Sequence, residues 1–145
     1  MDVFLANEQE LPVDETTLTA LARHTLGVED LDDDFELSIL LVDSDHMQTL
    51  NARFAGNDYV TDVLAFPMME EGEASTIMGD VVICPETARD NAARMNHSLD
   101  LEMRVLVVHG TLHLLGYDHQ GPEDRARMDE RMKEVLRTFE ATAIQ

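Results

Sequence analysis

The chain has 145 residues, a formal net charge of −20 and a single cysteine, Cys84. This length suits one domain with one well-buried core, and a lone cysteine excludes an internal disulfide. No apolar run is long enough to span a membrane and no signal peptide is evident, so we expect a cytoplasmic protein without a membrane partner. Cys84 stands in an apolar run, where we expect a small core residue.

The first half of the chain predicts two strands, each followed by a helix. Residues 3–6 are a short apolar run that predicts an edge strand. Residues 14–27 carry apolar side chains at helical spacing and end in glycine, which predicts an amphipathic helix. Residues 35–41 alternate between apolar and polar positions, which predicts a half-buried strand. Asp43 or Ser44 can then cap the next helix.

The second half of the chain predicts two strands and three helices. The expected elements are strands at 61–66 and 79–84 with a loop or hairpin between them, then helices beginning at Pro85, covering 101–115 and beginning at Pro122. Residues 101–115 are apolar on nearly all sides, so this helix must be buried. The order of elements indicates an α+β fold for residues 1–145, in which a small mixed sheet packs with about five helices.

Three of the six histidines lie within the segment H-G-T-L-H-L-L-G-Y-D-H, residues 109–119. His109 and His113 lie on one face of a helix, with Cβ atoms about 6 Å apart. Gly116 can adopt the left-handed conformation that ends a helix, which allows the chain to turn back and bring His119 to the same place. Three histidines and an open position are the ligand set of a catalytic zinc ion. The spacing therefore predicts a metal site at the end of the buried central helix.

The same spacing occurs in metzincin proteases, in which a glutamate after the first histidine is the general base. This chain has Gly110 at that position, and glycine cannot accept a proton from zinc-bound water. A metalloprotease is therefore disfavoured, because it would need a base from elsewhere in the chain. The remaining histidines, His24, His46 and His97, have no metal-ligand spacing, and we expect surface or capping roles for them.

The histidine segment resembles the signature H-G-x-L-H-L-x-G-Y-D-H of the bacterial YbeY family. Segments within residues 50–67 and 79–84 also resemble blocks of that family, in the same order, and the resemblance covers residues 35–139. It implies a metal-dependent endoribonuclease that acts on single-stranded RNA. It further implies roles in rRNA maturation, at the 3′ end of 16S rRNA, and in quality control of 70S ribosomes. The implied partners are the ribosome and its assembly factors, and no DNA is expected.

The expected cofactor is zinc, held by His109, His113 and His119. Three neutral imidazoles would leave the full charge of the ion on its bound water and lower the pKa of that water toward about 7. Nickel fits three imidazoles nearly as well and stays an alternative. Asp118 is expected to orient a ligand imidazole, with proton transfer as the alternative. Tyr117 is expected to pack with its hydroxyl group hydrogen-bonded.

The segment expected to face the substrate departs from the family pattern. The family's arginine before Gly56, which is proposed to hold substrate phosphate, is replaced by Ala55. The family's proline before Thr61 is replaced by Val60. Arg53 is the nearest arginine and the candidate substrate-binding residue, with a solvated helix arginine as the alternative.

The acidic charge also weighs against a nucleic-acid substrate, because phosphates are ordinarily bound by a basic face. The charge is uneven, however: residues 1–88 hold two basic and twenty acidic groups, whereas residues 89–145 hold eight and ten. Residues 29–36 alone hold six acidic groups, and we expect a solvated connection there, with a docking patch for a basic partner as the alternative. These features keep open a second hypothesis, a metal-stabilised ribosome-assembly protein that binds without cleaving RNA.

Overall fold

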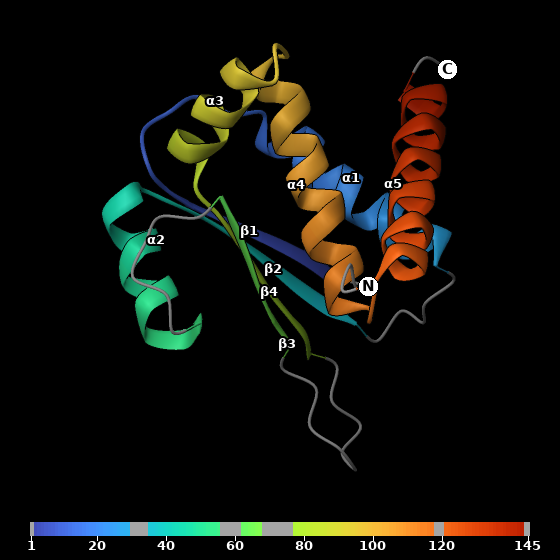
Figure 1. The fold of residues 1–145 in the computed structure, drawn as a ribbon, viewed down its shortest axis with the longest axis horizontal. Coiled ribbons are helices and arrows are strands. Elements are labelled where there is room, and N and C mark those ends of the chain that lie inside the picture. The colour runs from blue at the N-terminus through green and yellow to red at the C-terminus, as the bar shows by residue number, and fades with distance from the viewer. Residues whose placement is uncertain (1, 30–34, 56–61, 68–76, 118–120, 144–145) are drawn as a thin grey trace.

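The computed structural model describes residues 2–29, 35–55, 62–67, 77–117 and 121–143. Within these residues the chain forms four strands and five α-helices (Figure 1). The elements are β1 (Asp2–Glu8), α1 (Glu15–Val28), β2 (Glu36–Val42), α2 (Ser44–Leu50), the π-helical turn η1 (Asn51–Ala55), β3 (Val63–Pro67), β4 (Ile77–Ile83), α3 (Pro85–Arg94), α4 (Leu99–Leu114) and α5 (Pro122–Ala143). The predicted α+β fold with a small mixed sheet is confirmed.

The strands lie in the order β1-β2-β4-β3. β1, β2 and β4 run parallel to one another, and β3 runs antiparallel to β4. The prediction of an edge strand near the N-terminus is confirmed, because β1 pairs with β2 alone, from Asp2 opposite Glu36 to Glu8 opposite Val42, among the strands that the structure describes. β3 forms the other edge.

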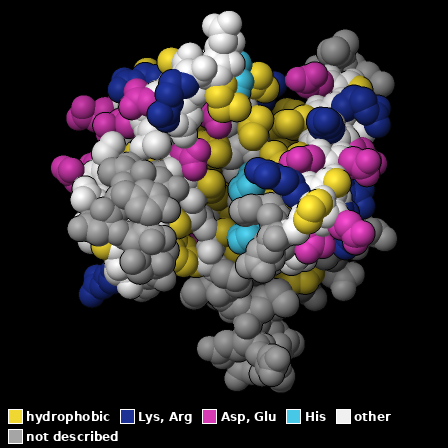
Figure 2. All heavy atoms as spheres, viewed as in Figure 1, with side chains coloured by type: hydrophobic (Ala, Val, Ile, Leu, Met, Phe, Trp, Pro, Cys, Tyr) yellow, Lys and Arg dark blue, Asp and Glu magenta, His cyan; other side chains and the backbone are white. Residues whose placement is uncertain are grey.

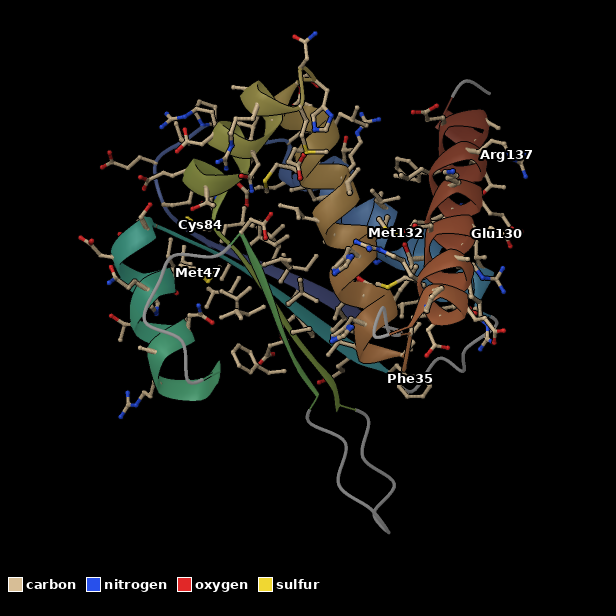
Figure 3. The ribbon with its side chains drawn as sticks, in the orientation of Figure 1. Phe35, Met47, Cys84, Glu130, Met132 and Arg137 are labelled. Atoms are coloured by element: carbon tan, nitrogen blue, oxygen red, sulfur yellow. The ribbon has the colours of Figure 1, made fainter. Side chains whose placement is uncertain are left out.

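Different helices cover the two faces of the sheet (Figure 1). Side chains of a strand alternate between its faces. On β2, Ile39 and Leu41 pack with α1 and α4, whereas Leu40 and Val42 pack with α2. Figure 3 shows Met47 and Cys84 between α2 and the sheet, and both side chains are fully buried, which confirms the predicted core role of Cys84.

α4 is the central helix, and it packs against α1, α3, α5, β3 and β4. It begins after the N-cap Ser98, whose hydroxyl oxygen accepts a hydrogen bond from the N–H of Leu101 at 3.1 Å. Its predicted burial is confirmed on the faces toward the sheet and its helical neighbours, although Leu101 is 39% exposed. α5 packs along α4 through buried Met128 and Val135. Among the described residues, none of the helices has the length and apolarity needed to cross a membrane.

Two predicted connections lie largely outside the described residues. The acidic stretch 29–36 includes the undescribed residues 30–34, while Glu29 is the C-cap of α1 and Glu36 begins β2. The predicted loop or hairpin between the third and fourth strands also lies outside them, at residues 68–76.

Candidate metal centre

α4 presents His109 and His113 side by side near its C-terminus. Their imidazole rings are nearly parallel, with 8° between the ring planes and 6.2 Å between the ring centroids. His113 is exposed and His109 is half-buried, and Figure 2 shows histidine side chains of α4 at the surface in the middle of the face drawn. Two nitrogens bound to one zinc ion lie at most about 4.2 Å apart, and ring centroids lie farther apart than nitrogens that face a shared ion. Both rings lie on one face of α4, and their ligand nitrogens must approach to that distance to bind one ion.

α4 ends at the predicted glycine turn. Gly116 has a φ of 100°, in the left-handed region that glycine tolerates best. Its N–H donates to the carbonyl of His113, and the N–H of Tyr117 donates to the carbonyl of Leu112, each at 3.1 Å. These two hydrogen bonds are those of the Schellman motif. The chain thus leaves the helix axis directly after the histidine pair.

The third predicted ligand, His119, and Asp118 lie outside the described residues. Within the described part of the chain, no three His, Cys, Asp or Glu side chains are grouped to hold a metal. The residues on either side have backbone hydrogen bonds: the N–H of Tyr117 donates to the carbonyl of Leu112, and the carbonyl of Gly121 accepts from the N–H of Arg125 at 2.9 Å. Because His119 follows Tyr117 by two residues, their Cα atoms are at most about 7 Å apart. His119 is therefore tied covalently to the end of α4, and its role as a ligand stays a prediction.

Tyr117 is held by a group that sequence reasoning missed. Its ring packs among apolar side chains of α1, α4 and α5, and its hydroxyl oxygen accepts a hydrogen bond from Nε of Arg131 at 3.2 Å. This hydrogen bond is the main cause that raises the pKa of the Arg131 guanidinium. The packed and hydrogen-bonded role predicted for Tyr117 is confirmed. Its partner could not be predicted, because α5 lies beside this turn only in the folded chain.

Gly110 marks the place where α4 crosses the sheet. A Cβ atom at this position would lie 2.6 Å from Cγ1 of Val81 and 3.4 Å from Cγ2 of Val63. Contacts under 3.0 Å are closer than real Cβ atoms make, so glycine permits the close approach of the helix to β3 and β4. A side chain here would point into the sheet. The position after the first histidine therefore has no room for the general base of a metalloprotease.

Arg53, the predicted substrate-binding residue, has an exposed side chain in η1. The preceding helix, α2, covers the face of the sheet opposite to α4 (Figure 1). Arg53 and the histidine pair thus come from elements on opposite faces, and the substrate-binding role of Arg53 stays a prediction. The π-helical turn itself was not predicted, and residues 56–61 after it lie outside the described part.

Two of the other histidines, both partly buried, make side-chain contacts in addition to the surface or capping roles expected for them. His97 Nε2 lies 2.5 Å from Oε2 of Glu102, whose side chain is 7% exposed, so this pair joins the residue before the N-cap of α4 to the helix itself. His24 Nε2 lies 2.7 Å from Oγ1 of Thr138 and joins α1 to α5. The contact of His24 joins helices far apart in the sequence, which residue spacing does not reveal, whereas His97 and Glu102 are only five residues apart.

The mixed sheet, the central helix and its histidine pair before a left-handed turn define an α+β protein with a candidate metal site on a helix. The family model described as Endoribonuclease YbeY matches residues 4–140. A relative of that name from Parafrankia sp. is 41% identical over 154 aligned residues, covering 99% of this chain and 97% of the relative. Another, from Thermobifida fusca, is 43% identical over 143 residues, covering 94% and 92%.

The fold is also similar to the solution structure of TM1509 from Thermotoga maritima, with a TM-score of 0.64 and 30% identity. That similarity covers 98% of this chain and 93% of the other. The chain belongs to the Endoribonuclease YbeY family, which confirms the resemblance found in the sequence.

Proposed function

We propose that the protein is an endoribonuclease that hydrolyses single-stranded RNA, with a metal ion held by His109, His113 and His119. The observation that carries this proposal is the parallel histidine pair on α4, followed at once by the left-handed turn at Gly116. The relatives of this chain are named endoribonucleases, which supports cleavage within an RNA strand.

The donor set fits zinc. Imidazole nitrogen is a usual zinc ligand, and nickel is the alternative that three imidazoles also accept. When bound, such an ion offers a Lewis acid and a water of lowered pKa for phosphodiester hydrolysis. The chain's own contribution is to place the imidazoles: α4 fixes His109 and His113, and the Gly116 turn directs the chain toward His119. We assign Asp118 the task of orienting a ligand imidazole, with a proton-transfer role as the alternative.

The substrate in the cell would be ribosomal RNA, with maturation of the 16S 3′ end and quality control of 70S ribosomes as the processes served. The partners would be the ribosome and its assembly factors, in the cytoplasm. Family membership supports this assignment. So does the balance of charge near the histidines, since Figure 2 shows acidic and basic side chains interleaved over α5. A negative substrate thus meets a mixed surface there, despite the net charge of −20.

A second function is favoured by one observation, the alanine at position 55 where the family carries an arginine. Without that cation, the protein could bind ribosomal partners through a metal-stabilised fold and leave RNA uncut. The two functions differ in what the metal site does. A structural site is needed for folding itself, whereas a catalytic site is needed for turnover by a chain that also folds without the metal.

The test is cleavage of an end-labelled single-stranded RNA by the zinc-loaded protein, with a duplex of the same sequence beside it. Wild type is compared with His113→Ala, Ala55→Arg and the control His46→Ala, whose histidine lies on α2. Because His113 is exposed, its loss should leave the far-UV circular dichroism spectrum unchanged. We expect cleavage of the single strand alone, lost with chelator or His113→Ala and kept in His46→Ala. No cleavage by wild type, with activity gained in Ala55→Arg, would instead support the binding function.

A further inference from the structure

Arg131 of α5 joins three parts of the chain near the end of α4. Its Nε lies 3.2 Å from the hydroxyl oxygen of Tyr117 and 3.5 Å from Oε1 of Glu29. Its Nη1 lies 3.0 Å from Oε2 of Glu134 in the next turn of the same helix. Glu29 is the C-cap of α1, and Tyr117 follows the turn that ends α4. One guanidinium group therefore connects the ends of α1 and α4 to α5.

The burial of this group shows that it is more than a surface ion pair. The side chain of Glu29 is 14% exposed and that of Arg131 is 30% exposed. Oε1 of Glu29 is buried, and it has no hydrogen-bond donor among the described residues, so the nearby guanidinium is what compensates its charge. A buried carboxylate holds its cation more firmly than an exposed one, because water screens the pair less. Glu29 thus fixes the position from which Arg131 reaches Tyr117.

Arg131 and Glu29 can influence the proposed metal centre through Tyr117. Its backbone N–H completes the Schellman motif, its ring packs in the core beside Leu112, and its hydroxyl group is held by Arg131. Both ends of its side chain are thereby fixed relative to α4. The hydrogen bonds from Tyr117 to Leu112 and from Gly116 to His113 hold the last turn of α4, so a displacement of Tyr117 is passed on to the turn that carries His113.

Metal ligands must sit within about 0.2 Å of their ideal distances, so a small displacement of one ligand weakens binding. We propose that Arg131, oriented by Glu29, is a positioning residue for the metal centre, acting through its hydrogen bond to Tyr117. This inference rests on the proposed metal site of His109, His113 and His119, and extends it with residues from α1 and α5. Arg131 touches neither metal nor substrate in this role.

The test is the zinc dissociation constant, measured by competition with a chromogenic chelator, in the full chain. Tyr117→Phe removes only the hydroxyl group and leaves the contact of Arg131 with Glu29 in place. Arg131→Gln removes the cation as well. The matched control is Arg137→Gln, because Arg137 lies on the same helix and points away from α4 (Figure 3). We expect zinc affinity to fall about 10-fold in Tyr117→Phe and Arg131→Gln, the lower end of the range for groups that bond to metal ligands directly, and to stay unchanged in the control.

Thermal unfolding of the metal-free proteins separates positioning from mere stability. Lower unfolding midpoints together with wild-type zinc affinity in Tyr117→Phe would overturn the inference, while the metal site itself would stand. Failure of wild type to bind zinc would overturn both the inference and the proposed metal site. If Arg131→Gln does not fold because Glu29 is left without its cation, Tyr117→Phe alone decides. A double variant that loses no more affinity than either single one would confirm that the two residues act as one unit.

Discussion

Gly110 of α4 and Val81 of β4 pack so closely that a single added carbon would meet a methyl group at 2.6 Å. Val81 is fully buried, and so cannot move aside freely. The contact sets the distance between the sheet and the helix that carries both described histidines. In the sequence, Gly110 occupies the position at which a metzincin protease has its general base. In the structure, its small size is what the site requires.

Replacing this glycine should therefore be costly. We expect Gly110→Ala to reduce the free energy of unfolding by about 1–3 kcal/mol, the usual cost of an added carbon in a packed core. Urea unfolding measures the change. Gly27→Ala is the matched control, because a Cβ atom at Gly27, within α1, would meet nothing within 4 Å. That variant should be neutral or gain about 0.5–1 kcal/mol, since alanine favours the helix. Equal losses in both variants would contradict the packing argument.

The contact between His97 and Glu102 predicts a second stability effect. Glu102 is 5% exposed overall, and His97 is the partner that satisfies its carboxylate at the start of α4. We expect His97→Ala to cost about 1–3 kcal/mol of unfolding free energy, because a buried acceptor loses its partner. Chemical denaturation is the measurement. His97→Gln, which keeps a donor, should recover part of the loss, and Glu102→Gln in the His97→Ala background should reduce the penalty further.

Asp14, the N-cap of α1, predicts a dependence of stability on pH. The side-chain hydroxyl of Thr17 and then its backbone N–H lower the pKa of the Asp14 carboxyl below its ordinary value of 3.8. A carboxyl group whose pKa is lowered on folding stabilises the protein above the unfolded pKa, and that contribution is lost as the pH falls through the folded pKa. The difference in unfolding midpoint between wild type and Asp14→Ala should therefore be full at pH 6 and shrink below pH 3.8.

The control for this prediction is Asp14→Asn, which keeps a capping oxygen without an ionisable group. Its unfolding midpoint should lie near that of wild type at pH 6. The contribution of residue 14 to the midpoint should no longer change as the pH falls. The prediction is contradicted if the difference in unfolding midpoint between wild type and Asp14→Ala is the same at all pH values. Ionisation of Asp14 would then have no part in the cap.

Zinc should stabilise the folded chain, because the ligand arrangement exists only when α4 is formed and buried. At a free zinc concentration one hundred times the dissociation constant, we expect about 2.7 kcal/mol of added unfolding free energy. Differential scanning calorimetry with and without chelator measures this. His113→Ala should remove the gain, whereas His46→Ala should keep it. A zinc effect that survives His113→Ala would place the ion elsewhere.

Much of the local structure could be predicted from the sequence, since it depends on neighbouring residues. The left-handed end of α4 follows from Gly116, and the burial of α4 follows from its apolar run. The start of α1 follows from Asp14, which bonds to Thr17 three residues later. Each of these features is determined within about two helical turns of chain.

Features that join distant parts of the chain could not be predicted in this way. The insertion of β4 between β2 and β3 depends on strand pairing across an intervening helix. The hydrogen bond from Arg131 to Tyr117 depends on how α5 lies against α4, which residue spacing does not determine. Gly110 illustrates the difference. The sequence shows that a glycine stands there, but the need for so small a residue comes from Val81, on a strand from another part of the chain.

The position of β1 at the edge of the sheet has a consequence for how separate molecules meet. An edge strand offers backbone groups to which another strand can bond, and here the exposed ring of Phe4 adds apolar surface. If two copies paired β1 antiparallel along its whole length, Asp2 of each would face Glu8 of the other. Like charges directly opposite one another destabilise such a pair. Repulsion between the acidic ends of β1 thus disfavours pairing of the sheets of two molecules. Added salt would screen this repulsion and weaken its effect.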